Sequence, residues 1–262
     1  MVTVHNFQYG PVTPVAAYLL SSLGAFLGLR CTTRARALDG AARASWLLLA
    51  AVAIGALGIW VMHFIAMLGF DIPGETIRYS VPVTLLSVVI AVAVVAAGLL
   101  IVGFGQPTWR NLMLAGAVTG LGVATVHYTA MGAMRMPAMM SYNVPLFGVS
   151  AVIAVMLATI AFWAAMRLTR IWSTIGAALL IGAAVTVMHY TGMAAMRISR
   201  APANMMMNTG GSTVSGFLLP LICCITLMTF LLISIIGISP SAQEIKEEAE
   251  LLERSRARGL QV

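Results

Sequence analysis

Three histidines head near-copies of one short string in this chain. The strings are Met62-His63-Phe64-Ile65-Ala66-Met67, Val126-His127-Tyr128-Thr129-Ala130-Met131 and Met188-His189-Tyr190-Thr191-Gly192-Met193. The chain has only four histidines, and these three recur at intervals of 64 and 62 residues. Each string lies near the end of a long apolar segment, where an ionisable side chain is costly and indicates a functional site. Equivalent positions in a repeat suggest one shared site.

Thioether side chains accompany the histidines. A methionine follows each histidine by four residues: Met67, Met131 and Met193. Two copies have another methionine seven residues after the histidine: Met134 and Met196. Residues i, i+4 and i+7 share one helix face, so we expect imidazole and thioether groups to project together. Met62 and Met188 lie about 100° around the helix from their histidines and are weaker candidates.

This donor set favours copper as the cofactor. Thioether sulfur suits copper(I), imidazole binds copper well, and no carboxylate is nearby. Haem ligation by two facing histidines is a chemical alternative. Structural explanations also exist, because a histidine can hydrogen-bond within a helix bundle and methionine is a common apolar filler.

Hydroxyl groups adjoin two of the histidines and could orient them. Tyr128, Tyr190, Thr129 and Thr191 follow His127 and His189, whereas the first copy has Phe64 and Ile65. Their hydroxyls could bind the second imidazole nitrogen and set its tautomer, as metal sites usually require. The alternative is that the tyrosines anchor the helices at the headgroup level of a membrane.

The composition predicts an all-α integral membrane protein. Hydrophobic residues make up 60% of the 262 residues and charged residues 9%, whereas soluble domains have about 25% charged residues. A span needs about 20 apolar residues, and seven segments qualify: 13–29, 46–68, 82–104, 112–132, 145–166, 174–195 and 217–238. They form three helix pairs plus a seventh helix. The first 29 residues lack Lys and Arg, so we expect no signal peptide.

Basic residues predict the orientation. Alternate loops and the tail hold 11 of the 15 Lys and Arg residues, which places the N-terminus outside and the C-terminus in the cytoplasm. The three histidines then lie near the outer face of the plasma membrane. Because the net charge of +7 reflects this asymmetry, we expect no nucleic-acid partner.

Small residues precede each histidine by seven and five positions: Ala56 and Gly58, Gly120 and Gly122, Gly182 and Ala184. Small residues let membrane helices approach closely. We therefore expect the three histidine-bearing helices to form a closely packed inner trio.

At these strings the chain resembles the MHYT domain family, over about residues 1–238. The resemblance implies a bacterial seven-helix membrane sensor that binds copper through His63, His127 and His189 with Met67, Met131 and Met193. It also implies a diatomic gas ligand, namely oxygen, carbon monoxide or nitric oxide. Copper itself is the alternative signal. Many family members continue into cyclase, phosphodiesterase or kinase domains. This sequence holds none, so we expect signalling to a separate cytoplasmic partner.

No enzyme motif is evident, and no Asp or Glu lies inside a predicted span, which favours a sensor or binding module over an enzyme; copper handling or a metal-dependent membrane enzyme stays open. Residues 1–240 form the predicted membrane domain, and residues 241–262 form a charged tail. That tail is either solvated or a docking helix for the partner.

Overall fold

The computed structural model describes residues 4–106, 108–136, 138–168, 170–200 and 212–213. Helices dominate the described chain: α1 (Val12–Ala35), α2 (Gly40–Ala51), η1 (Val52–Val61), α3 (Met62–Met67), α4 (Val81–Phe104), α5 (Trp109–Gly132), α6 (Val144–Arg167) and α7 (Ile171–Ala195). Because α2, η1 and α3 form one continuous helix, the described residues contain six helices long and apolar enough to cross a membrane.

These six helices coincide with the first six predicted spans, which confirms the all-α class of the membrane part. The largest differences are at the first connection, where α1 ends at Ala35 and the second span begins at Gly40. Both helices extend past the apolar segment because their polar ends still pack, with the Arg34 guanidinium 5.2 Å from the Trp46 ring centre. The predicted seventh span, 217–238, and the tail, 241–262, lie outside the described residues.

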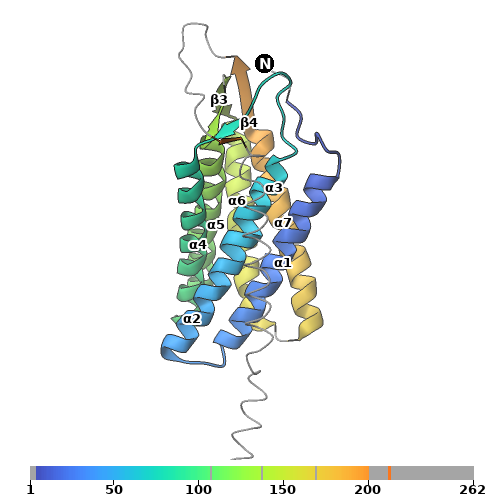
Figure 1. The fold of residues 1–262 in the computed structure, drawn as a ribbon. Coiled ribbons are helices and arrows are strands. Elements are labelled where there is room, and N and C mark those ends of the chain that lie inside the picture. Colours follow the sequence, from blue (N-terminus) through green and yellow to red (C-terminus); the bar gives the residue numbers. More distant parts are fainter. Residues whose placement is uncertain (1–3, 107, 137, 169, 201–211, 214–262) are drawn as a thin grey trace, which may run out of the picture.

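The helices stand side by side in one bundle and pack in chain order (Figure 1). The ring of helices is closed by α1, which packs against α7 as well as against η1. The histidine-bearing helices therefore alternate with the others around the ring. The helix α3, which contains His63, lies at the end of the bundle that carries the strands (Figure 1). His127 and His189 lie in the last two turns of α5 and α7, which lead into β2 and β4.

The small residues face the alternate helices instead of each other. An added Cβ on Gly24 of α1 would lie 2.5 Å from the Gly58 backbone. An added Cβ on Gly120 would overlap the α6 backbone at Val155, and one on Gly182 would overlap Ser22 of α1. The prediction that these small residues pack the three histidine-bearing helices against one another is therefore wrong. Glycine permits a close approach but does not specify the partner.

A π-helix, η1, occupies the middle of the second span and was not predicted. Its wider turn brings Gly55 against α4, where an added Cβ would lie 2.8 Å from the Ala91 carbonyl oxygen. Trp60, near its end, donates a 2.9 Å hydrogen bond to Ser87 of α4. Such π-helical segments occur frequently at functional sites, and this one leads directly into α3 and His63.

Short strands, also not predicted, cap the histidine end of the bundle (Figure 1). The strand β1 (Arg78–Tyr79) pairs antiparallel with β2 (Met134–Arg135) and with β5 (Ser212–Thr213). The strand β3 (Ala138–Tyr142) pairs antiparallel with β4 (Met196–Arg200). The N-terminal lead joins this cap through paired backbone hydrogen bonds of 2.9 and 2.8 Å between His5 and Asp71. The segments after all three strings are thus tied together.

Candidate metal centre

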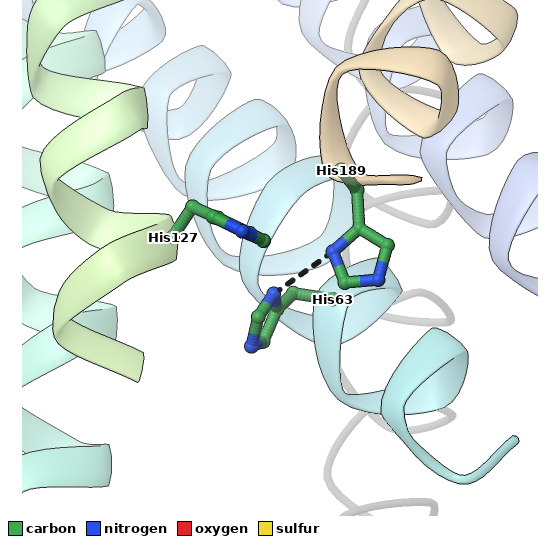
Figure 2. A group of neighbouring side chains, drawn as sticks. All are labelled: His63, His127 and His189. Carbon is green, nitrogen blue, oxygen red and sulfur yellow. Dashed lines mark hydrogen bonds between the residues drawn. The ribbon is translucent and has the colours of Figure 1, made fainter. Parts of the chain in front are cut away.

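The three repeated histidines meet in the interior of the bundle (Figure 2). His63 comes from α3, His127 from α5 and His189 from α7, each close to the end of its helix. Their exposed fractions are 4%, 4% and 1%. Buried polar side chains at equivalent repeat positions thus converge from three helices that alternate around the bundle.

The imidazole rings have nearly three-fold geometry. Ring centres are 5.1 Å apart for His63 and His127, 4.9 Å for His63 and His189, and 5.1 Å for His127 and His189. The corresponding ring planes cross at 86°, 85° and 84°. Each histidine offers one ring nitrogen such that all three nitrogens lie within 4.8 Å of one another. This arrangement can direct three nitrogen lone pairs toward one point.

Hydrogen bonding leaves much of the imidazole capacity unused. The Nδ1 atoms of His63 and His189 lie 3.1 Å apart, so one ring donates its N–H and the other accepts with a neutral nitrogen. The Nε2 atoms of all three histidines are buried with no hydrogen-bond partner among the described residues. A buried polar atom left without a partner costs about 1–3 kcal/mol. The triad therefore has ring nitrogens that could hold a metal ion.

A single metal ion fits this geometry. Three imidazole nitrogens bound at the roughly 2.0–2.1 Å typical of zinc would lie about 3.3–3.6 Å from one another. The observed spacings, from 3.1 Å to at most 4.8 Å, require only small rotations of the rings. A cavity of about 10 Å³ adjoins all three histidines, which is about the room that one water-sized species needs.

Haem does not fit between the histidines. A porphyrin ring must lie between its two axial ligands, and it needs a slot as wide as the macrocycle. The Nδ1 atoms of His63 and His189 are in hydrogen-bond contact, and the space beside the three rings is only about 10 Å³. The arrangement suits one small ion.

The methionines lie in two groups around the triad. Met62 and Met188 line the same small cavity as the histidines, together with Ile59, Val123 and Val126. Met67, Met131 and Met193, one turn nearer the cap, are almost fully buried and belong to one apolar cluster. The two positions that seemed weaker in the sequence are thus the ones that share the cavity with the imidazoles.

The other two candidate methionines do not continue the helical face. Since α5 ends at Gly132 and α7 at Ala195, Met134 lies in β2 and Met196 begins β4. The expectation that residues i+7 share the helix face is wrong here because both helices stop before that turn. Met134 is buried and Met196 packs against the same apolar cluster.

The neighbouring hydroxyl groups bind elsewhere or have no partner. Tyr128 shares a 2.8 Å hydrogen bond with Ser150 of α6, and Thr191 donates to the Val187 carbonyl at 2.8 Å. The Tyr190 hydroxyl is buried and has no partner among the described residues, while its ring lies 5.3 Å from that of Phe7. Thr129 is half-buried. Packing and the hydrogen bond between the Nδ1 atoms of His63 and His189 orient the imidazoles in this structure.

Gly192 is a site residue that the sequence pattern did not single out. An added Cβ at this position would overlap the His127 imidazole, with Cδ2 at 2.9 Å. The corresponding positions of the first two strings hold Ala66 and Ala130. The sequence signal for this contact was the glycine at a position where the other two strings have alanine. Only glycine lets α7 pass this close to the His127 ring.

Aromatic residues form a neutral cover over the triad. Phe64 is fully buried, and its ring contacts Trp60 at 4.9 Å and Tyr79 of β1 at 5.7 Å. Burial raises the pKa of Tyr79 above its ordinary value, so the phenol stays protonated at physiological pH. Burial also raises the pKa of Tyr142, and the nearby Tyr128 adds to this shift. The cover therefore adds no charge near the histidines.

Comparison with known proteins identifies the family. The family model MHYT, described as a bacterial signalling protein N-terminal repeat, matches residues 57–115, 120–178 and 182–245. The bifunctional diguanylate cyclase/cyclic di-GMP phosphodiesterase MucR of Pseudomonas aeruginosa is 32% identical over 95% of this chain and 37% of its own length. The cyclic di-GMP phosphodiesterase NbdA of the same organism is 35% identical over 75% of the chain and 25% of its own length.

A signalling protein of Caulobacter vibrioides is 36% identical over 67% of the chain and 21% of its own length. The chain thus spans between about a fifth and two fifths of the length of these curated relatives. No solved structure matches it. The three family matches together cover well over half of the residues, and each match contains one of the three histidine strings. This multi-pass membrane protein therefore belongs to the MHYT family.

Proposed function

We propose that the chain is a membrane sensor module that binds one copper ion between His63, His127 and His189. The observation that carries this proposal is the convergence of three ring nitrogens within 4.8 Å in the bundle interior. The 3.1 Å spacing of the His63 and His189 Nδ1 atoms and the adjoining cavity of about 10 Å³ suit a single bound ion. Such a set of donors is costly to bury unless it serves a ligand.

Copper is favoured over other metals by the atoms around the cavity. Its lining offers imidazole nitrogen and the thioether sulfur of Met62 and Met188, with no carboxylate. Soft thioether ligands select copper(I), while carboxylate and carbonyl oxygen suit magnesium, calcium or manganese. Met67, Met131 and Met193 supply further thioethers one turn away and remain candidate ligands. Copper held here would supply a centre able to bind oxygen, carbon monoxide or nitric oxide.

An apolar cavity next to the histidine cavity supports a diatomic gas as the signal. A second cavity of about 70 Å³ lies in the middle of the bundle and is lined almost entirely by apolar side chains. It shares Ile59, Val123 and Met188 with the histidine cavity. Apolar cavities stay free of water and accept small apolar molecules. A gas molecule held in this cavity would lie one layer of side chains away from the histidine cavity.

The distribution of basic residues supports a placement of the histidines near the outer face. The described end opposite the strands carries seven arginines: Arg30, Arg34, Arg36, Arg43, Arg110, Arg167 and Arg170. The histidine end carries Arg78, Arg135, Arg197 and Arg200. By the positive-inside rule the first end faces the cytoplasm. A signal received outside would then be passed to a cytoplasmic partner, and the names of the relatives point to turnover of cyclic di-GMP as the regulated output.

Metal analysis of the purified chain tests the proposal. We expect about one copper ion per chain, and at least about tenfold weaker retention after His127→Ala or His189→Ala, the scale seen when a metal site loses an orienting or ligating group. His5→Ala, in the N-terminal lead, is the matched control and should retain copper fully. Full retention by the triple variant His63→Ala, His127→Ala, His189→Ala would exclude this site, and a zinc-only protein would exclude the choice of metal.

Copper transfer is a second candidate function, and one observation favours it. Methionines lead from the surface to the triad: Met139 is 44% exposed on β3, Met140 is half-buried, and Met136, Met134 and Met131 are buried in one cluster. A carrier would load and release copper(I) through this path. Fast exchange of bound copper with a chelator in solution, slowed by Met136→Leu, would favour transfer over sensing.

A further inference from the structure

A cavity of about 140 Å³ lies at the end of the bundle opposite the histidines. It is enclosed by the ends of four helices, α1, α2, α4 and α6, and two arginines contribute to its lining: Arg36 and Arg43. We call it the arginine cavity. It is distinct from the metal centre, because it shares no lining residue with the histidine cavity.

Arg36 is held in place by the end of α6. Its Nη1 atom donates to the carbonyl oxygens of Ala165 at 3.0 Å and Leu168 at 3.3 Å. These bonds satisfy carbonyl groups that a helix end leaves without intrahelical partners. A guanidinium has five N–H donors, so Arg36 retains donors for another partner after fixing α6 to α1.

Arg43 brings a second guanidinium to the same space with a donor to spare. Its Nε is buried and has no hydrogen-bond partner among the described residues. Its charged end lies 5.3 Å from the centre of the Phe104 ring, which holds the side chain by a cation–π contact. No described carboxylate forms an ion pair with either arginine. Two positive groups thus line one cavity, and neither is paired with a carboxylate of the described residues.

The remaining walls are apolar. Leu47, Val102 and Met166 line the sides, and the floor residues Leu99 and Ala165 also line the apolar cavity in the middle of the bundle. A site with cationic donors at its mouth and an apolar interior matches an amphiphile with an anionic head. A soluble anion would use only the arginines, whereas a membrane lipid would use both parts.

We propose that the arginine cavity binds the phosphate headgroup of an anionic phospholipid from the adjacent leaflet. Guanidinium groups pair with phosphate through parallel N–H donors, and basic pockets between membrane helices are recognised sites for anionic lipid heads. The phosphate would accept from Arg36 and Arg43, and the first part of the acyl or glycerol segment would contact Leu47 and Val102. The lipid would join the ends of α1, α2 and α6.

Native mass spectrometry of the detergent-purified full chain tests this assignment. The protein is titrated separately with phosphatidylglycerol, with phosphatidylcholine and with inorganic phosphate. We expect retained phosphatidylglycerol, and at least about fivefold weaker retention in Arg43→Gln, since each basic residue near a membrane surface contributes about this factor to anionic-lipid binding. Arg110→Gln is the matched control: Arg110 is exposed at the same end and does not line the cavity.

A second variant separates binding from folding. Val102→Phe fills the cavity without changing the charge, so it should also lose phosphatidylglycerol while keeping copper at the distant triad. The same loss in Arg110→Gln as in Arg43→Gln would reduce the effect to general charge and overturn the proposal. Equal retention of phosphatidylcholine, or a site occupied by inorganic phosphate alone, would overturn it as well.

Discussion

Gly192→Ala gives the sharpest test of the metal centre, because sequence and structure predict opposite results. The other two strings carry alanine at this position, Ala66 and Ala130, so the repeat pattern alone predicts a harmless change. In the structure the new methyl group would lie 2.9 Å from the His127 Cδ2 atom and closer still to Nε2. The change adds one carbon atom to the protein and nothing to its charge.

The expected size of the effect follows from contact distances. Carbon atoms prefer separations of about 3.5–4.0 Å, so the His127 ring must move by at least about 0.6 Å. A functional metal site tolerates ligand distances only within about 0.2 Å of their ideal values. We therefore expect copper affinity to fall roughly 10- to 100-fold, the range seen for loss of a supporting group, with about 1–3 kcal/mol of destabilisation from overpacking.

The assay is competition for copper(I) with a chromophoric chelator, with thermal unfolding measured in parallel. Gly176→Ala is the matched control, because it lies on the same helix and an added Cβ would meet nothing within 4 Å. It should bind copper like the unaltered protein and gain up to about 1 kcal/mol of helix stability. If Gly192→Ala holds copper as tightly as Gly176→Ala, the ion is not held by His127 in the observed geometry.

Three further predictions test the surroundings of the triad. Met188→Leu should lower copper(I) retention more than Met67→Leu, because Met188 lines the histidine cavity. A larger effect of Met67→Leu on retention would place the ion among Met67, Met131 and Met193. Gly120→Ala should destabilise the protein by about 1–3 kcal/mol through overlap with the α6 backbone. Gly148→Ala, which lies inside α6 and meets nothing within 4 Å, should instead gain up to about 1 kcal/mol of helix stability. In intact cells an impermeant maleimide should label a cysteine at Glu75 but not one at Ala37, and the reverse pattern would invert the topology.

The six described spans and the histidine triad could be predicted because their signals are local and repeated. Apolar length identifies a span, and equal positions within each repeat place His63, His127 and His189 at one depth of the bundle. Their convergence could therefore be predicted without knowing which helices are in contact. The same logic supplied the methionines at i+4, which are buried in one cluster, although their role as ligands stays a prediction.

Other features depend on packing partners that no local pattern specifies. Gly58 and Gly120 indicate close helix approach, but their partners in α1 and α6 follow from the order of helices around the ring. The π-helical hydrogen bonding of η1 could not be predicted, because Val52–Val61 is apolar throughout and shows no periodic pattern of polar and apolar residues. Met134 and Met196 leave the helical face because strand pairing in the cap ends α5 and α7 first. Each of these outcomes is decided by contacts between residues far apart in the chain.

One continuous helix connects the metal centre to the far end of the bundle. The span Gly40–Met67 carries His63 near one end and Arg43 near the other, with the π-helix η1 between them. Movement of His63 as the ring nitrogens close on an ion would act on η1, where a change of hydrogen-bond register shifts one half of the helix against the other. A bound ligand biases such a change only through different affinity for the two arrangements.

We therefore expect saturating copper to change hydrogen exchange in α2, at residues 40–47, as well as around the triad. The Gly192→Ala variant should lose both changes together, because its defect lies at the metal centre and not in α2. Gly176→Ala should keep both. If copper alters hydrogen exchange only near the histidines and not in α2, then copper binding does not reach the distant end of the helix. The metal site would then serve copper transfer or storage instead of signalling.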